Sequence, residues 1–214
     1  MTAAVVDNDA TGASRAGLAA PARVAALCVV GVALLWVAAA LIPAPHRADA
    51  DALQVFLELG RPRVNRWASS LTRLLDPLPF VVLSFLVLAV ALGRRRPQVA
   101  LAGLAVLALA PLSCEALKPL LAHTHIQLGF APRVPPASFP SGHATAALAL
   151  ALCAVLVAPS RLRIAVAVLG SAFAVATGCS QLILGRHMPS DVLAGYLLAM
   201  LWMALVILAL RVRS

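Results

Sequence analysis

The sequence predicts an all-α integral membrane protein, a bundle of six transmembrane helices with its functional site in loops and helix ends on the outer side. The chain of 214 residues is 62% hydrophobic and 12% charged, whereas a soluble domain is about half apolar and about a quarter charged. Its apolar residues form continuous runs without the alternation of a β-barrel, which indicates helical spans. Ionisable residues collect in the connections between these runs, and at a membrane face they indicate function.

Six segments reach or approach the ~20 helical residues that cross a hydrocarbon core of ~30 Å. Residues 1–20 are polar, with Asp7, Asn8 and Asp9, and are predicted to be a disordered cytoplasmic tail. The first apolar run is too long for a signal-peptide core and lacks a good cleavage site, so it is interpreted as a span. One domain, 21–214, would then hold the bundle. The predicted spans are 24–43, 77–93, 98–117, 142–159, 162–184 and 191–210.

The connection 44–76 mixes Leu, Val, Phe and Trp with Arg and Glu, which predicts an amphipathic segment lying in the membrane interface. With six spans, both termini and the turns 94–97 and 160–161 share one side of the membrane. That side holds nine of the 17 Lys and Arg residues, including the three arginines of the short GRRRP turn. Because short basic loops dominate orientation, we expect both termini in the cytoplasm and a location in the inner (plasma) membrane. A net charge of +9 distributed in this way does not indicate a nucleic-acid partner.

The stretch FPSGHATAALAL, residues 139–150, predicts a turn followed by a helix start. Ser141 is placed to cap the helix, and Gly142 allows a ligand to approach the backbone closely. Helix N-termini bind phosphate through unpaired N–H groups and partial positive charge. His143 would lie beside such an anion. Taken alone, the stretch also fits an ordinary helix cap with a buried histidine.

The stretch SQLILGRHMPSD, residues 180–191, places His187 just before the sixth span and Asp191 in its first turn. A carboxylate beside an imidazole fixes its tautomer and stabilises the imidazolium form. The alternative is that Pro-Ser-Asp only starts a helix. Lys118, the one lysine of the chain, ends the third span three residues after Glu115. It fits a functional cation, an intrahelical ion pair or a snorkelling side chain.

Together these residues resemble the type 2 phosphatidic acid phosphatase superfamily, which also includes vanadium haloperoxidases. The family pattern is K-x6-R-P, then P-S-G-H, then S-R-x5-H-x3-D. In this sequence the corresponding stretches are KPLLAHTHI (118–126), PSGH (140–143) and SQLILGRHMPSD (180–191). The resemblance extends over almost the whole chain from about residue 24.

The resemblance implies that His187 attacks phosphorus and becomes a phosphohistidine, with Asp191 orienting it. His143 would protonate the leaving oxygen and then activate water, a division of roles that phosphoryl transfer permits. Lys118, the Ser141 hydroxyl and the Gly142 amide would hold the phosphate oxygens. No metal or cofactor is expected, because protein cations would supply the positive charge. The expected partners are a phosphorylated lipid substrate, of the phospholipid or polyprenyl type, and the surrounding membrane lipids.

The sequence departs from the family pattern at two arginines. His125 and Gln181 stand in their places and are expected to contact phosphate with less charge. Each charged hydrogen bond contributes roughly 1.5–3 kcal/mol, so the loss is substantial. Arg186 is a candidate to compensate, as are Arg133 and His123. The alternatives are a lipid phosphotransferase of the same fold and a degenerate protein that binds lipid phosphates without hydrolysing them.

Three further features bear on the prediction. A transporter is disfavoured, because the polar residues lie at one face rather than at the membrane midplane. A zinc site at the two histidines of the HTH stretch is a weaker alternative. Usage rich in Arg and Ala with one lysine is typical of a GC-rich bacterial genome. The sequence does not predict an oligomeric state.

Overall fold

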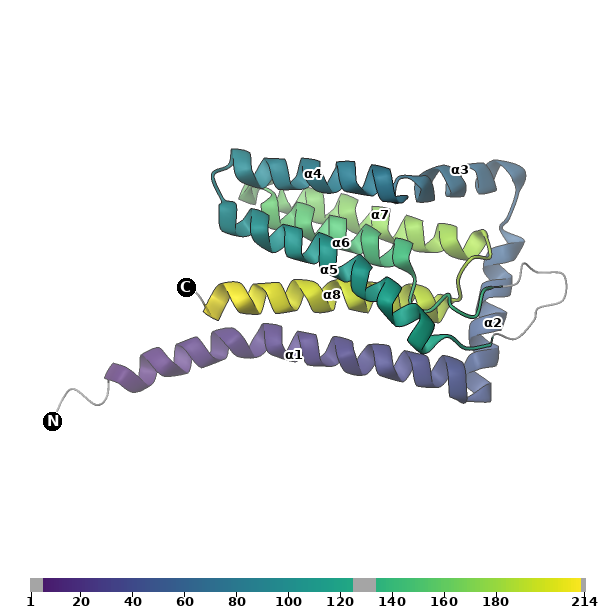
Figure 1. Ribbon diagram of the computed structural model, residues 1–214, viewed down its shortest axis with the longest axis horizontal. Helices are drawn as coiled ribbons and strands as arrows, with labels where there is room; N and C mark the ends of the chain where they lie inside the picture. Colours follow the sequence, from purple (N-terminus) through teal and green to yellow (C-terminus); the bar gives the residue numbers. More distant parts are fainter. Residues whose placement is uncertain (1–5, 125–133, 213–214) are drawn as a thin grey trace.

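A computed structural model describes residues 6–124 and 134–212, with side chains from residue 18 onward. Every regular element in these ranges is a helix (Figure 1). The helices are α1 (Val6–Leu41), α2 (Pro43–Glu58), α3 (Pro62–Arg73), α4 (Pro77–Gly93), α5 (Pro97–Leu121), α6 (Gly142–Val157), α7 (Arg163–Ile183) and α8 (Pro189–Val212), with a 3-10 turn at Ser160–Leu162 before α7.

Proline marks the starts of the helices. α2, α3, α4, α5 and α8 each begin with a proline, which has no N–H to lose in the first turn and a backbone angle already suited to a helix. α6 has no proline at its start and is capped by the Ser141 side chain instead. The local sequence therefore sets the start of these six helices.

The helices account for fewer membrane spans than the six predicted. Within the described residues, four helical segments are long and apolar enough to cross a membrane, and a fifth arises if α3 and α4, bent by 57°, are one span. α6 is apolar but has 16 residues, or about 24 Å of helix. The four segments are Leu18–Leu41, Pro97–Leu121, Ser160–Ile183 and Pro189–Val212.

Two predicted segments differ in the structure. α1 begins at Val6, inside the region predicted to be a disordered tail. The single amphipathic segment predicted over 44–76 is two helices, α2 and α3, because Gly60 and Pro62 interrupt it.

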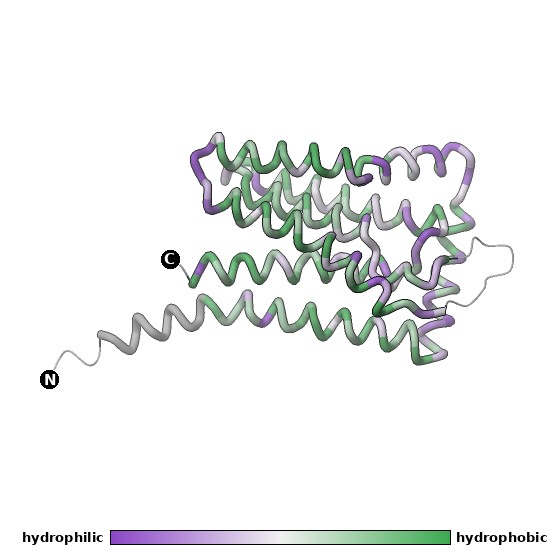
Figure 2. Tube along the Cα trace, viewed as in Figure 1, coloured by the Kyte–Doolittle hydropathy of each residue, from purple (hydrophilic) through white to green (hydrophobic). Residues whose placement is uncertain are grey.

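α6 lies at the centre of the bundle and packs against α4, α5, α7 and α8, while α1 lies along α8 (Figure 1). The buried residues of α6 are mostly alanine, and small side chains allow membrane helices to approach closely. The outer faces of the bundle expose large apolar side chains such as Phe85 and Ile164. Figure 2 shows this apolar surface along the helices, with polar residues at their ends and in α2 and α3. Such a surface is suited to lipid.

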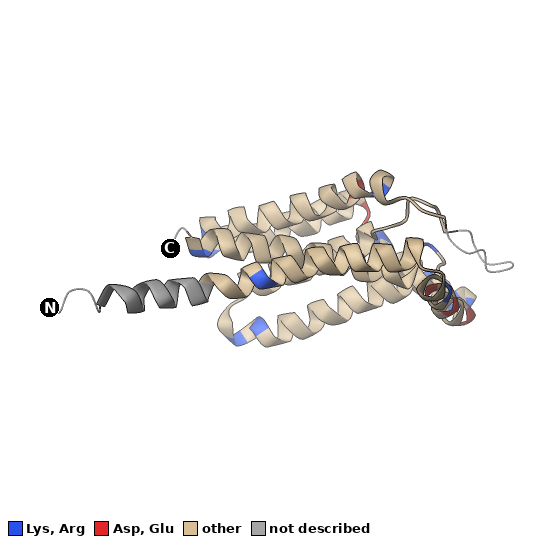
Figure 3. Cartoon of the chain, turned by 90° about the horizontal axis from the view of Figure 1, so that it is seen from below, with Lys and Arg blue, Asp and Glu red and all other residues tan. Residues whose placement is uncertain are grey.

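The topology gathers the site residues at one end of the bundle. The C-terminal ends of α5 and α7 meet the N-terminal ends of α6 and α8 there, and α2 crosses the same end (Figure 1). The N- and C-termini lie at the other end. Asp and Glu residues with described side chains occur only toward the α2 end, whereas Lys and Arg occur at both (Figure 3).

Candidate active site

The N-terminus of α6 is fixed by hydrogen bonds on two sides. The Ser141 side chain accepts a bond from the Ala144 N–H at 3.4 Å, and the Thr145 hydroxyl donates to the Ser141 carbonyl at 2.9 Å. The Ser141 N–H donates to the carbonyl of Asp191 at 2.9 Å. The starts of α6 and α8 are thereby joined directly. Two of the three sequence motifs meet at this bond.

His187 and Asp191 form the pair that their spacing suggests. The Asp191 carboxylate is fully buried, and its Oδ2 lies 3.3 Å from His187 Nδ1. The same oxygen accepts the Met188 N–H at 2.9 Å, which holds the carboxylate in place. Because Nδ1 faces Asp191, Nε2 is the ring nitrogen that can act on a ligand.

Lys118 lies next to the start of α6. Its Nζ is 2.6 Å from Glu115 Oε1, so the intrahelical ion pair considered from the sequence is present. A side chain added at Gly142 would approach Glu115 Oε1 to 3.0 Å and Lys118 Nζ to 3.7 Å. The ammonium group is therefore close to the α6 N-terminus, where an anion would be attracted. Glu115 is largely exposed and can exchange its contact for one with water.

His143 is the residue through which the two histidine motifs interact. Its Nε2 is 3.6 Å from Asp76 Oδ1, an ion-pair distance longer than a hydrogen bond. The bond from the Ser141 N–H to the Asp191 carbonyl places the first turn of α6, which carries His143, beside the turn that precedes α8 and carries His187. Asp76 precedes α4 and was not predicted from the sequence. A single Asp before proline indicates only the start of a helix. Its contact with His143 follows from the packing of α4 on α6.

A comparison with protein-family models finds a match to the PAP2 superfamily over residues 81–214, more than half of the chain and including all three motifs. The chain belongs to the PAP2 superfamily. The candidate site residues lie within the matched region, in α5, α6, α7 and α8 and in the connection between α7 and α8. No curated protein matches the sequence.

A solved structure supports the membership over a longer part of the chain. It is the crystal structure of the first transmembrane PAP2-type phosphatidylglycerolphosphate phosphatase from Bacillus subtilis, with a TM-score of 0.69 and 25% sequence identity. The alignment covers 87% of this chain and 93% of the Bacillus chain. The likeness therefore includes helices that precede the matched PAP2 region. This family and this neighbour identify the chain as a membrane protein of the phosphatase class.

Gln181 stands where the family pattern predicts an arginine. Its side chain is fully buried, and neither amide atom has a hydrogen-bond partner among the described residues. A buried amide without partners is costly, so this position is suited to a bound water or a ligand oxygen. Ser180 beside it is satisfied, because its hydroxyl donates to the Ala176 carbonyl at 2.7 Å.

Arg186 lies back along α7 beside Gln181. Gly185 has a left-handed backbone with φ of 64°, and the Arg186 N–H donates to the Gln181 carbonyl at 3.0 Å. The Gly185 N–H donates to Leu182 in the same turn, which completes the helix-ending arrangement that favours glycine at this position. The arginine side chain is exposed. These bonds fix the Arg186 backbone about one turn from Gln181, the position where the family motif has an arginine.

Asp49 on α2 holds the start of α8. Its Oδ1 accepts the Ser190 N–H at 3.0 Å and its Oδ2 accepts the Ser190 hydroxyl at 2.6 Å. Burial raises the pKa of the Asp49 carboxyl, and the two bonds from Ser190 offset part of this effect. This contact could not be predicted from the sequence, because Asp49 is one of three acidic residues on an amphipathic helix.

The remaining predicted positions are placed only in part. His125 and Arg133 lie outside the described residues. His123 contacts the end of α5 and the following loop. Its ring Nδ1 lies 3.0 Å from the Leu121 carbonyl, and its backbone N–H donates to the Pro136 carbonyl. Its ring lies 6.1 Å from that of Phe139.

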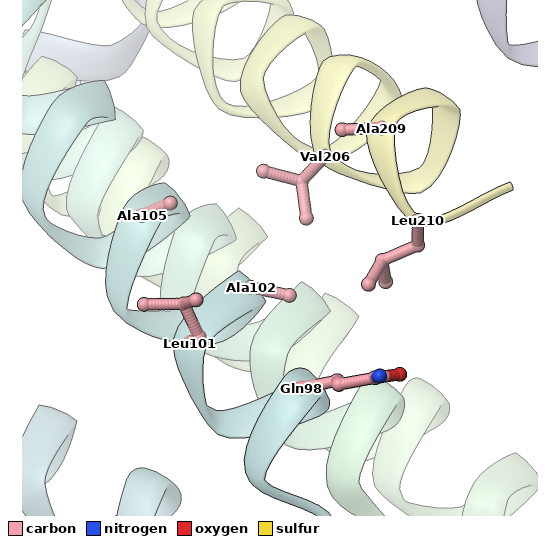
Figure 4. A pocket seen from close by; sticks show the side chains of 7 residues that line it. All are labelled: Gln98, Leu101, Ala102, Ala105, Val206, Ala209 and Leu210. Carbon is pink, nitrogen blue, oxygen red and sulfur yellow. The ribbon is translucent and has the colours of Figure 1, made fainter. Parts of the chain in front are cut away.

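A cavity of about 240 Å³ lies far from this site, at the opposite end of the bundle. It is formed between the start of α5 and the end of α8, and apolar side chains line it with one amide at its edge (Figure 4). It contains none of the groups that phosphoryl transfer requires. Its lining residues are Gln98, Leu101, Ala102, Ala105, Val206, Ala209 and Leu210.

Proposed function

We propose that this chain is a membrane-embedded lipid phosphatase that hydrolyses a phosphate monoester or diphosphate of a phospholipid or polyprenyl lipid. The observation that carries the proposal is the His187–Asp191 pair, which is joined through Asp191 to the capped N-terminus of α6, the helix whose first turn carries His143. A nucleophile, an acid–base group and an anion-binding helix end are the groups that a metal-independent phosphoryl transfer needs.

In the first step, the lone pair of His187 Nε2 forms a bond to phosphorus. The bond from phosphorus to the lipid oxygen breaks, and protonated His143 gives its proton to that oxygen, so the lipid alcohol leaves. Asp191 stabilises the imidazolium character that develops on His187, through Nδ1. The product of this step is a phosphohistidine.

In the second step, His143 accepts a proton from water as the water oxygen attacks phosphorus. The nitrogen–phosphorus bond breaks, its electron pair returns to His187, and inorganic phosphate leaves. Lys118, the Ser141 hydroxyl and the Gly142 N–H hold the equatorial oxygens and spread their charge. Gln181 contributes a neutral donor and Arg186 a cation at the exposed edge.

The substrate is a lipid whose tail lies in the bilayer while its phosphate reaches the α2 end of the bundle. The Bacillus neighbour is a phosphatidylglycerolphosphate phosphatase, and this makes phosphatidylglycerophosphate the first substrate to test. We place the chain in a bacterial inner membrane, with both termini in the cytoplasm. In this arrangement, α4, with the bent α3 before it at the membrane surface, and the short α6 complete six spans, and the site faces the outer side.

A phosphate-release screen tests the proposal. Purified protein in detergent is offered phosphatidate, phosphatidylglycerophosphate, and polyprenyl mono- and diphosphates. We expect release from at least one of them, with no release from His187→Ala and a strongly reduced rate for His143→Ala. Acid-labile radioactive phosphate should be trapped on wild-type protein and not on His187→Ala. Release by His187→Ala at the wild-type rate would refute the phosphohistidine scheme.

A second candidate function is a lipid-phosphate-binding protein without turnover, and the uncharged Gln181 favours it. In this case, wild-type protein would bind a phosphorylated lipid without releasing phosphate, and Gln181→Arg would restore release. A related phosphotransferase would pass the phosphoryl group to a lipid alcohol. Adding such an alcohol to the screen and following lipid products separates transfer from hydrolysis.

A further inference from the structure

One face of α3 is exposed and basic. Arg63, Arg66, Trp67 and Ser70 are spaced by three, one and three residues, so they lie on one side of the helix. They line an open hollow of about 320 Å³. Trp67 is 71% exposed. This face, defined by these four residues, is called the α3 face below.

The opposite side of α3 is packed against the bundle, which fixes the direction of the α3 face. Ala68 and Thr72 are buried, and α3 contacts α7. α3 joins α4 at a bend of 57°, at the end of the molecule that holds the site (Figure 1). Figure 2 shows polar residues concentrated in α3, next to the apolar α4. The α3 face therefore points away from the protein, at the end of the apolar outer surface of the bundle.

The charge on this face is not neutralised within the described part of the chain. α3 contains Arg63, Arg66 and Arg73 and no acidic residue. Arg61, just before it, is engaged by the carbonyls of Glu58 and Gly60. Neither Arg63 nor Arg66 makes an ion pair or a side-chain hydrogen bond to a described residue. Arginine in contact with hydrocarbon is costly, so these two groups require an anionic environment or water.

We propose that the α3 face binds the phosphate headgroup of an anionic phospholipid of the surrounding leaflet. Two guanidinium groups one helical turn apart can both reach one phosphodiester, and arginine suits this geometry better than lysine. The exposed indole of Trp67 lies at the depth where tryptophan is enriched in membrane proteins. Binding here is separate from catalysis, since none of the four residues belongs to the site described above.

Trp67 provides a direct reporter of this binding. The protein has three tryptophans, and the other two are engaged inside the bundle, where Trp36 donates to Leu121 and Trp202 to Ser113. The difference in fluorescence quenching between wild-type protein and Trp67→Phe therefore reports on Trp67. The protein is reconstituted in phosphatidylcholine vesicles that contain a small fraction of spin-labelled phosphatidylglycerol or, in the parallel sample, spin-labelled phosphatidylcholine.

We expect phosphatidylglycerol to quench Trp67 preferentially, with about a fivefold affinity gain for each arginine that reaches the lipid phosphate. Arg63→Gln/Arg66→Gln should abolish the preference. The matched control is Arg94→Gln/Arg96→Gln in the turn at the other end of α4, which should keep it. His187→Ala should also keep it, because lipid binding does not require turnover.

Three results would overturn the proposal. They are equal quenching by the two lipids, a preference that survives in Arg63→Gln/Arg66→Gln, and an equal loss in the Arg94→Gln/Arg96→Gln control. If the α3 face instead binds a partner protein, vesicles without that partner would show equal quenching by the two lipids. The phosphate-release screen is independent of all three, so failure of the lipid site and failure of the phosphatase function are distinguishable.

Discussion

Single atoms of Asp191 determine how His187 is presented. Its Oδ2 faces the imidazole and also accepts the Met188 N–H. In Asp191→Asn, the neutral amide no longer stabilises the imidazolium form, and an amide nitrogen in the place of Oδ2 would favour the wrong tautomer of His187 and lose the bond from Met188. We expect kcat to fall by roughly 10³–10⁴, as tautomer errors do in catalytic triads, with KM little changed. Steady-state phosphate release measures both, and Asp51→Asn, exposed on α2, is the control.

Arg186 carries a second prediction at the residue scale. The guanidinium of Arg186 is expected to supply positive charge to the phosphate, which the neutral Gln181 cannot do. Arg186→Gln should then raise KM by about 10- to 100-fold, which corresponds to the loss of one charged hydrogen bond. Arg186→Lys should recover part of the affinity, because it keeps the charge without the bidentate geometry. Competition by vanadate or inorganic phosphate gives the affinity without turnover. Arg161→Gln, at the opposite end of the bundle, should be neutral, and an unchanged KM in Arg186→Gln would contradict the assignment.

The residues that the sequence predicts best are those whose role follows from position on a helix end. Ser141 caps α6, and His187 meets Asp191 four residues later. Asp49 and Asp76 could not be found in this way. Each contacts its partner only after distant segments pack, Asp49 with Ser190 and Asp76 with His143. The HTH stretch leads into a segment outside the described residues, so the role of His125 stays a prediction.

The helix α2 acts on the site through the bonds from Asp49 to α8. When the pKa of a carboxyl is raised in the folded state, the folded protein loses stability as pH rises, because the unfolded chain gives up that proton at a lower pH. For Asp49, burial is the main cause, Asp191 adds to it, and Ser190 and His46 oppose it. We therefore expect the unfolding temperature of Asp49→Asn, relative to wild type, to increase as pH rises above about 4. A difference that does not change with pH in detergent, or the same trend in Asp51→Asn, would contradict this.

The contact between α6 and α8 depends on Gly195. A Cβ there would lie 2.6 Å from the Ser141 carbonyl oxygen and 3.0 Å from Thr145 Oγ1. Backbone must move to admit it, at a cost of about 1–3 kcal/mol, which exceeds the roughly 0.5–1 kcal/mol that alanine gains in a helix. Gly195→Ala should lower the unfolding temperature and the rate of phosphate release. Gly93→Ala, with no atom within 4 Å of its Cβ, should do neither.

Helix positions were predictable where apolar runs are bounded by proline or glycine. The predicted span 77–93 coincides with α4, and 162–184 differs from α7 by one residue at each end. The break between α2 and α3 was missed, since a mixed apolar and basic pattern continues across it. The bend between α3 and α4 leaves no mark in hydropathy, although Pro77 marks the start of α4.

At the scale of the whole molecule, the two ends of the bundle differ in their charged residues. Acidic groups with described side chains lie only toward the α2 end, where they hold His143, α8 and Lys118. The other end carries arginines in two short turns, at 94–96 and 161–163. Arginines in short loops resist transfer across a membrane, so the arginine-rich end is the one expected to stay in the cytoplasm.

This asymmetry predicts which residues an impermeant reagent reaches. In a variant lacking the four native cysteines, a cysteine replacing Asp51 on α2 should react in intact cells with a membrane-impermeant maleimide. A cysteine replacing Ser160, in the turn between α6 and α7, should react only after permeabilisation. The second result also requires α6 to cross the membrane despite its length, since a re-entrant α6 would leave Ser160 on the same side as α2. Labelling of both positions in intact cells would exclude six spans, and the reverse pattern would invert the orientation while leaving the fold intact.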